Sequence, residues 1–239
     1  LGHRPGYLPN DHGFDAYEGI PYSNDMWAPY DPATKQWKKF KDWQTPLPWI
    51  RDGKSVAVVK NATDQSLLTH ATTKAALNFI REQGRKKEPF FAYLPYAAVH
   101  LPRVGHPDFL PAGAPPSEAN KTGVELTVHL KAQVEELDAA VGHVFSALKE
   151  LGVENNTIVL FMSDNGGSRG TSMGPLKGGK GSLFEGGPRT PFLIHWPGSI
   201  PAGKVSREIG VSSDLLPTLA KLCGGKLSGN KMDGRDLSA

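Results

Sequence analysis

A long amphipathic stretch, from about Val124 to Leu151, constrains the fold of this chain more than any other feature. Apolar residues recur in it at intervals of three and four, the spacing of a helix that buries one face. These residues are Leu126, Leu130, Val134, Leu137, Val141, Phe145 and Leu148. Gly152 is placed to end the helix, and the apolar run Thr157–Met162 that follows is typical of a buried strand. A long helix followed at once by a buried strand is part of a βαβ unit.

The rest of the chain continues this alternation. A helix is expected from Asp64, as its N-cap, to Gly84, as its stop signal. The further expected elements are a strand at Pro89–Leu94, a strand at Pro191–Trp196 and a helix at Ser213–Leu222. Residues 1–62 are rich in Pro, Gly, Trp and Tyr and are expected to form long loops and short strands. The pattern predicts an α/β fold with a largely parallel central sheet and helices on both faces.

Composition and charge exclude several classes of protein. With 38% hydrophobic and 21% charged residues among 239, the chain is typical of a folded globular domain and not of a disordered one. A formal net charge of +3 is too small to indicate binding to nucleic acid. No apolar run approaches the roughly 20 residues that a transmembrane helix needs. We therefore expect neither a nucleic-acid partner nor a membrane span in this segment.

A candidate cation site directly follows the predicted strand Thr157–Met162. Ser163 is followed by Asp164 and Asn165, and then by two glycines. The neighbouring carboxylate and amide oxygens of Asp164 and Asn165 are the kind of ligand that Ca²⁺ and Mg²⁺ prefer. Asp, Asn and Gly also form ordinary turns, so the tripeptide alone is equally compatible with a turn that ends the strand.

A candidate anion-binding lysine lies on the glycine-rich loop that follows. Lys180 comes about fifteen residues after Asn165, in the loop Gly178–Gly187, and could pair with an anionic substrate. Lys177 competes for this role, although the frame Gly-Lys-Gly-x-x-x-Glu-Gly-Gly favours Lys180. Glu185 and Arg189 are expected to hold the loop together through hydrogen bonds.

Several segments together resemble those of a known enzyme family, and they occur in the same order as in that family. Besides Ser163–Gly167 they are Gly19–Met26, Tyr93–Pro102, Glu136–Gly142, Gly174–Gly181, Glu185–Pro191 and Ser213–Thr218. The pattern closely resembles the type I sulfatases, arylsulfatase A-like members of the alkaline phosphatase superfamily. The resemblance covers most of the chain and implies the α/β fold of that superfamily.

The resemblance also implies roles for individual residues. Asp164 and Asn165 would be two of the metal ligands, with Ca²⁺ as the first choice and Mg²⁺ as the alternative. Lys180 would contact the sulfate and neutralise charge near the scissile oxygen. His100 would contact the sulfate or assist the leaving alcohol, and Ser23 would hydrogen-bond a sulfate oxygen or another substrate group. Such a metal and such cations stabilise charge on the sulfuryl oxygens as the S–O bond breaks.

The sequence departs from the family in its nucleophile. Sulfatases of this type carry a Cys-x-Pro-x-Arg motif, whose cysteine is oxidised to formylglycine, and an earlier pair of Asp ligands. The one cysteine here, Cys223, has no Pro or Arg at the required positions, and we interpret it as a buried small residue that closes a helix. Because Leu1-Gly2-His3 would follow the family's Gly-Lys-Trp-His segment, we expect a C-terminal portion of a longer protein, inactive alone, with the formylglycine in the missing part.

These observations predict a sulfatase that cleaves aryl or carbohydrate sulfate esters. Two alternatives remain: a noncatalytic module that binds a cation or a sulfated glycan, and a phosphoester or phosphonate hydrolase of the same superfamily. We expect one partial sulfatase domain over residues 1–239. Its parts would be a loop-rich substrate-face segment (1–62), an α/β core (63–225) and the start of a C-terminal extension (226–239). The resemblance implies a periplasmic, secreted or lysosomal location.

Overall fold

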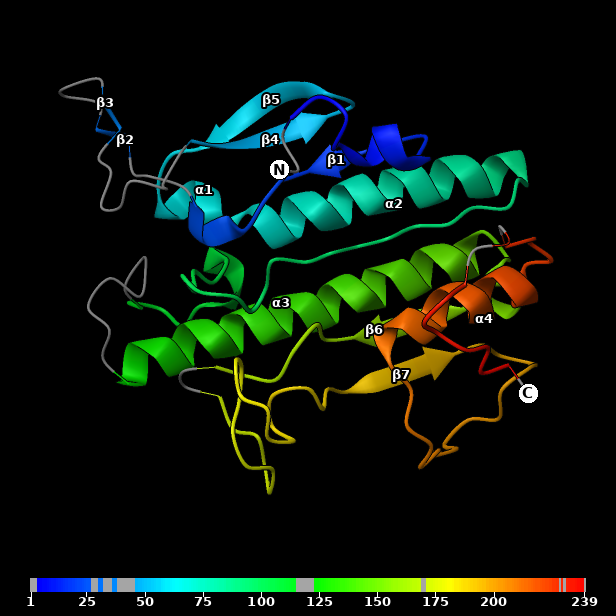
Figure 1. Cartoon of the computed structure of the whole chain (residues 1–239). Helices are drawn as coiled ribbons and strands as arrows, with labels where there is room; N and C mark the ends of the chain where they lie inside the picture. Colours follow the sequence, from blue (N-terminus) through cyan, green and yellow to red (C-terminus); the bar gives the residue numbers. More distant parts are fainter. Residues whose placement is uncertain are drawn as a thin grey trace. The chain divides into compact units, whose positions relative to one another are not determined.

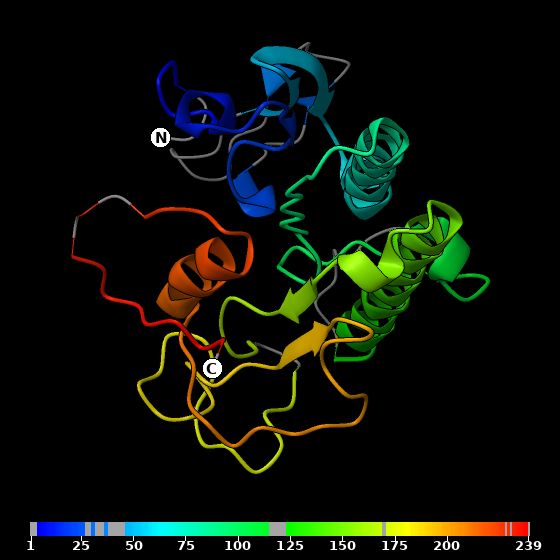
Figure 2. The same ribbon diagram turned by 90° about the vertical axis from the view of Figure 1, so that its right-hand side faces the viewer.

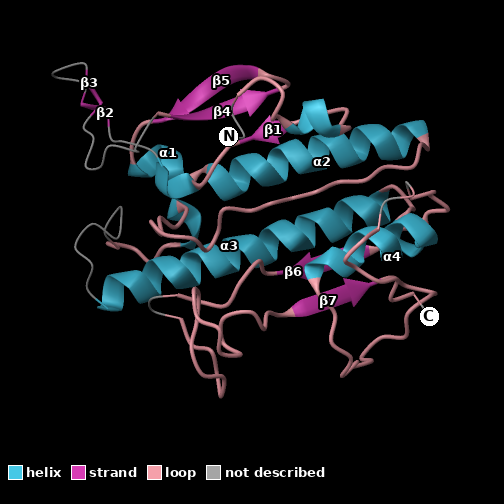
Figure 3. Cartoon of the chain, in the orientation of Figure 1, coloured by secondary structure: helices cyan, strands magenta, loops and turns pink. Residues whose placement is uncertain are grey.

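The computed structural model describes residues 4–26, 30–31, 36–37, 46–114, 123–168, 171–227, 229 and 231–238, which fall into two compact units, Leu1–Pro197 and Gly198–Ala239. The α-helices are α1 (Ala62–Ser66), α2 (Leu68–Lys86), α3 (Gly123–Glu150) and α4 (Leu215–Leu222) (Figure 1, Figure 3). The strands are β1 (Glu18–Gly19), β2 (Tyr30–Asp31), β3 (Gln36–Trp37), β4 (Leu47–Arg51), β5 (Lys54–Val59), β6 (Val159–Met162) and β7 (Phe192–His195). The 3-10 helices are η1 (Pro9–His12), η2 (Asn24–Met26), η3 (Pro107–Phe109), η4 (Glu154–Asn156) and η5 (Ser212–Asp214).

The loop-rich segment contains a small antiparallel sheet in the order β1-β4-β5. A two-residue turn joins β4 to β5, with positive φ at both Asp52 and Gly53, as tight hairpins require. Arg51 donates to both carboxylate oxygens of Glu18 on β1, at 2.9 and 2.8 Å, and this hydrogen bonding holds the pKa of Glu18 below its ordinary value. The prediction of loops and short strands in residues 1–62 is thus confirmed where the chain is described.

This sheet packs on the start of α2. Leu47, Trp49 and Val59 from the sheet and Leu68 from α2 form one buried apolar cluster. The sheet lies on the side of α2 that faces away from α3 (Figure 1, Figure 2). The β1-β4-β5 sheet is therefore anchored to the helical part of the chain by apolar burial.

The first predicted helix is interrupted, and its ends differ from the prediction. Its N-cap is Asn61, whose side chain accepts a hydrogen bond from the backbone N–H of Asp64 at 2.9 Å, so Asp64 lies inside α1. Gly84 does not stop α2, which continues to Lys86. A Cβ at Gly84 would lie 2.6 Å from Cδ1 of Leu151, so close packing accounts for this glycine, not a helix end.

Helices α2 and α3 lie side by side and run in the same direction, joined by a segment that returns between them (Figure 1). Ile80, Ala147 and Leu148 form a second buried apolar cluster at this contact. The return segment contains Pro89–Leu94, which we predicted to be a strand. That prediction is wrong: the segment has no ladder partner among the described strands, and a strand exists only when its backbone pairs with a neighbour.

The buried face of α3 agrees only in part with the apolar stripe that its spacing predicts. Leu148 of the stripe is buried, but the other buried residues are small or polar, and they are His129, Ala132, Gln133, Glu136, Ala140 and Ala147. In contrast, Val134 of the predicted stripe is 50% exposed. The helix and its end are confirmed, since α3 stops at Glu150 and Gly152 takes a φ of +68°. The buried face of α3 is thus more polar than periodicity alone indicates.

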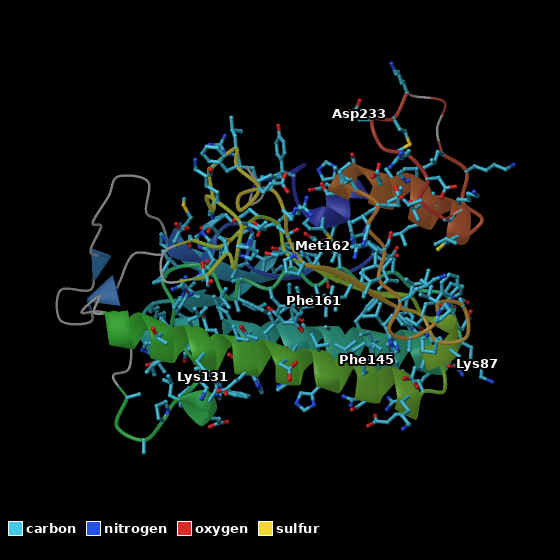
Figure 4. All side chains as sticks on the ribbon, turned by 90° about the horizontal axis from the view of Figure 1, so that it is seen from below. Lys87, Lys131, Phe145, Phe161, Met162 and Asp233 are labelled. Atoms are coloured by element: carbon cyan, nitrogen blue, oxygen red, sulfur yellow. The ribbon has the colours of Figure 1, made fainter. Side chains whose placement is uncertain are left out.

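Strands β6 and β7 form an antiparallel pair, with Val159 opposite His195 and Met162 opposite Phe192. Both strands were predicted, but the predicted parallel pairing is not present among the described strands, whose ladders are all antiparallel. Phe145 of α3 contacts the ring of His195 edge to face, at 4.8 Å between centroids. The side chains of Phe161 and Met162, which are labelled in Figure 4, remain 40% and 39% exposed.

The second compact unit contains η5 and α4, so the predicted helix at Ser213–Leu222 is confirmed with an initial 3-10 turn. Asp214 accepts hydrogen bonds from the backbone N–H groups of Val211 and Arg235, at 2.9 and 2.8 Å, which lower the pKa of its carboxyl group. Cys223 follows the last residue of α4, as predicted, but it is exposed and not buried. None of the helices in the described ranges combines the length and apolar character needed to span a bilayer.

Candidate functional site

The predicted cation-binding residues lie in the turn directly after β6. Asp164 is exposed and Asn165 is half-buried. The hydroxyl of Ser163 donates to the backbone oxygen of Asn165 at 3.1 Å, and the N–H of Gly166 donates to the oxygen of Gly187 at 2.7 Å. The strand end and these two hydrogen bonds fix the backbone from which the two side chains project.

Glycines allow the main chain of this turn to contact the main chain of the later loop, Gly178–Gly187. A Cβ at Gly166 would lie 1.8 Å from the oxygen of Gly186. At Gly179 it would lie 2.7 Å from the oxygen of Gly167, and at Gly187 it would lie 2.0 Å from the oxygen of Ser182. Any side chain at these positions would force the crossing chains apart. The glycine-rich composition therefore has a structural cause, which is the close approach of these main chains.

The same close approach of main chains attaches the backbone of Lys180 to the Asp164–Gly167 turn. The backbone N–H of Lys180 donates to the oxygen of Gly167 at 2.9 Å, and its side chain is exposed. Lys177 is engaged differently, because its ammonium nitrogen lies 4.0 Å from the centroid of the Phe184 ring, a cation–π contact. The local contacts thus favour Lys180 as the lysine that is available to an anion.

Further along the same loop, the predicted hydrogen bond between Arg189 and Glu185 is present as an exposed ion pair. The backbone N–H of Arg189 also donates to the oxygen of Glu185 at 3.0 Å. These contacts hold one turn of the loop, as expected.

His100 lies far from these residues in sequence and is joined to a different segment. Its ring atom Nδ1 lies 3.1 Å from Oδ1 of Asn24, and its backbone oxygen lies 3.5 Å from Nδ2 of the same residue. Asn24 begins η2 and is only 2% exposed, whereas the neighbouring Ser23 is exposed. The two predicted residues Ser23 and His100 are therefore brought into one region by Asn24, the residue next to Ser23.

Hydrogen bonds from buried groups support the loop around His100. The Nε of Arg103, which is 1% exposed, donates to the oxygen of Val99 at 3.3 Å. The N–H of Gly105 donates to Nδ1 of the fully buried His129 on α3 at 3.0 Å. The loop is consequently fixed to the long helix as well as to η2.

Two separate groups of predicted residues result, Asp164–Asn165 with Lys180 and Ser23 with His100. Within the part of the chain that the structure describes, no hydrogen bond or ion pair joins them. Nor does any set of three or more His, Cys, Asp or Glu side chains there come close enough together to hold a metal ion. That the two groups form one site is therefore a proposal.

Sequence reasoning missed Asn24. The residue lies inside the Gly19–Met26 segment that carried part of the resemblance, but Ser23 was chosen there. Nothing in the local sequence marks Asn24 as buried, since η2 is a single short turn. The importance of Asn24 becomes apparent from its contact with His100, 76 positions away in the sequence.

Comparisons with known proteins give the family. The model of the sulfatase family matches residues 4–225. N-acetylgalactosamine-6-sulfatase of Mus musculus is 36% identical over 245 residues, which cover 99% of this chain and 44% of that protein. The chain belongs to the sulfatase family. Arylsulfatase A of Homo sapiens is 34% identical over 249 residues, covering 100% of this chain and 46% of that protein.

Solved sulfatase-like structures agree with this assignment. The crystal structure of Ps i-CgsB in complex with k-i-k-neocarrahexaose matches with a TM-score of 0.77 and 34% identity, covering 98% of this chain and 51% of that chain. The PsFucS1 sulfatase from Pseudoalteromonas sp. matches with a TM-score of 0.78 and 26% identity, covering 98% and 48%. The predicted alkaline phosphatase-like α/β fold is confirmed. The chain spans about half the length of these sulfatases.

Proposed function

We propose that the protein containing this sulfatase chain hydrolyses sulfate esters. One observation in this chain of the sulfatase family supports the proposal. The backbone N–H of Lys180 donates to the oxygen of Gly167 at 2.9 Å, which holds the backbone of Lys180 beside the Asp164–Gly167 turn. A lysine whose backbone is held beside a turn that carries a carboxylate and an amide oxygen suits an ester that carries negative charge on several oxygens. A phosphate ester shares this feature, so substrate preference has to be measured.

A sulfated glycan is the substrate class that we propose. One relative is named for N-acetylgalactosamine-6-sulfate chemistry, and one similar structure holds a carrageenan-type hexaose. The location predicted from the resemblance, periplasmic, secreted or lysosomal, fits such substrates and forms part of the same proposal.

Under this proposal the side chains of the chain bind and orient the ester. The exposed ammonium of Lys180 would pair with a sulfate oxygen and offset the charge that grows there as the S–O bond breaks. His100 would contact the sulfate or the leaving oxygen through its ring. The exposed hydroxyl of Ser23 would donate a hydrogen bond to an oxygen of the substrate.

The donor set after β6 fits a hard divalent cation in kind. Asp164 offers a carboxylate and Asn165 an amide oxygen, whereas Ca²⁺ takes six to eight oxygen ligands, so most ligands would come from other residues. When bound, the cation would supply positive charge next to the sulfate oxygens. The attacking oxygen would come from the formylglycine hydrate that the family resemblance implies.

The function is tested in the full-length protein with an aryl sulfate and the matching aryl phosphate. Lys180→Ala is expected to lower kcat for the sulfate about 100-fold or more. Lys177→Ala is the matched control, because Lys177 lies on the same loop but contacts Phe184, and it should retain most of the activity. Faster turnover of the phosphate would favour a phosphoester hydrolase. Binding of sulfated glycan with no turnover of either ester would favour a noncatalytic module.

Metal content provides a separate test. Asp164→Ala and Asn165→Ala are expected to reduce bound Ca²⁺ in the full-length protein, measured by elemental analysis after dialysis. Wild-type metal content in both variants would show that the cation site lies elsewhere.

A further inference from the structure

The amide of Asn24 faces His100 with both of its polar atoms. Its Nδ2 can only donate, and the backbone oxygen of His100, 3.5 Å away, can only accept. This contact, although at the long end for a hydrogen bond, orients the amide so that Oδ1 faces the ring, 3.1 Å from Nδ1. Asn24 is 2% exposed, so water cannot easily replace either contact.

Two oxygens converge on the same ring nitrogen. Besides Oδ1 of Asn24, the backbone oxygen of Leu101 lies 2.7 Å from Nδ1 of His100. Both oxygens are acceptors, so Nδ1 must carry the hydrogen. A neutral imidazole with its hydrogen on Nδ1 has its lone pair on Nε2. Over the described ranges, Nε2 of His100 has no hydrogen-bond partner.

Among the described residues, Asn24 provides the long-range contact of this ring. The backbone N–H of His100, in contrast, makes a local hydrogen bond to the oxygen of Ala97, at 2.8 Å. Arg103 likewise holds Val99, four residues away. Within the described residues, Asn24 is thus the residue that ties the ring itself to the loop-rich segment that contains Ser23.

We propose that Asn24 is a positioning residue, which holds His100 in the Nδ1–H tautomer so that Nε2 is the nitrogen presented to the substrate. The role at the substrate rests on the proposed function, whereas the tautomer and its dependence on Asn24 do not. A neutral Nε2 accepts a hydrogen bond or a proton, and a protonated Nε2 donates to a sulfate or leaving oxygen. Asn24 therefore acts on the reaction only through the orientation of the ring.

The tautomer is measured directly by nitrogen NMR of the 239-residue chain with ¹⁵N-labelled histidine. The His100 signals are assigned by their loss in His100→Gln, and spectra are taken at a pH where the titration curve of this ring shows it to be neutral. We expect a protonated-type shift for Nδ1 and an unprotonated-type shift for Nε2. The opposite pattern would overturn the proposal, and this result needs no enzymatic turnover.

Two substitutions separate positioning from simple packing. Asn24→Leu keeps a similar size but removes both hydrogen bonds, and it should lower the fraction of the Nδ1–H form. Asn24→Asp keeps an acceptor oxygen at the ring and should retain that form. Asn78→Leu, at an exposed position on α2, is the control for a general effect of replacing Asn by Leu. Wild-type tautomer populations in Asn24→Leu would contradict the inference, and if this variant does not fold, the Asn24→Asp spectrum decides in its place.

Kinetics in the full-length protein link the tautomer to the reaction. Asn24→Leu should lower kcat about tenfold or more with a smaller change in KM, since the loss of a residue that orients a functional histidine has effects of this size. An unchanged kcat together with a shifted tautomer would refute the positioning role at the substrate. Absence of sulfate ester turnover in the wild type would refute the proposed function and leave the tautomer result standing.

Discussion

The buried carboxyl group of Glu136 makes the stability of this chain depend on pH. Glu136 is 6% exposed on the α2-facing side of α3, and its Oε1 has no hydrogen-bond partner within the described residues. Burial raises the pKa of Glu136 from 4.5 to about 7, opposed in part by a hydrogen bond from the backbone N–H of His70 and increased by the charge of Asp108. The folded chain consequently binds this proton more tightly than the unfolded chain does.

The sign and size of the effect follow from linkage. Between pH 4.5 and about 7 the folded state holds the proton and the unfolded state has lost it, so the free energy of unfolding falls as pH rises. At 1.36 kcal/mol per pKa unit, the total loss is about 3 kcal/mol. Below pH 4.5 both states are protonated, and this contribution to stability is fully present.

Glu136→Gln removes the titrating group and keeps the shape. The unfolding free energy of this variant minus that of the wild type, from urea denaturation at pH 4.5, 6 and 8, should rise by about 3 kcal/mol across the series. Taking the difference cancels most contributions of groups that do not interact with Glu136. Glu135→Gln is the matched control. Glu135 is exposed beside Lys131, and its replacement should change stability by about 0.5 kcal/mol or less at every pH.

A flat difference across this pH range would refute the reasoning, since it would mean that Glu136 ionises equally easily in the folded and unfolded chains. A difference that falls with pH would mean that the folded state favours the carboxylate, for example because the N–H groups at the start of α2 outweigh the cost of burial.

Three further substitutions test local features by chemical denaturation. Gly166→Ala should lower the free energy of unfolding by about 2 kcal/mol or more, since its Cβ would lie 1.8 Å from the oxygen of Gly186. Wild-type stability in this variant would show that the two main chains do not approach so closely. Gly142→Ala, inside α3 with no atom within 4 Å of the added Cβ, should stabilise the chain by up to about 1 kcal/mol, and a loss would contradict this free space. Asn61→Ala removes the N-cap of α1 and should lower the free energy of unfolding by about 1 kcal/mol, whereas Asn61→Asp should lower it less. Equal effects of the two substitutions would argue against the cap.

The elements that the sequence predicts well are those whose pattern is complete within a short window. The helix before Gly152 and the apolar run before Ser163 appear as α3 and β6, with ends within two residues of the prediction. Periodicity and end signals are local, so no tertiary information is needed for them. The turn with Asp164 and Asn165 is equally local, because it follows from the end of an apolar strand.

Features that depend on a distant partner were predicted poorly. Pro89–Leu94 has the composition of a strand, but Phe91 and Tyr93 are 62% and 70% exposed, and no described strand pairs with the segment. Similarly, apolar spacing identifies a stripe on α3, but it does not tell that His129, Gln133 and Glu136 of this helix are buried as well. A sequence pattern specifies which residues favour burial, whereas the neighbouring elements decide which face is covered.

The same distinction explains what could be predicted of the candidate site. Asp164, Asn165 and Lys180 are the predicted site residues, yet the contacts between their segments are made by glycines: Gly166, Gly179 and Gly187 allow main chains to approach at distances that no side chain permits. The spacing of Lys180 from the turn therefore has a geometric meaning only because of these glycines. His100 has no such signature in its sequence, since a buried amide 76 residues earlier fixes its ring. Substitution of these glycines should accordingly disturb the position of Lys180 as much as substitution of the residues next to Lys180 in the loop. The Asn24–His100 contact should remain unchanged.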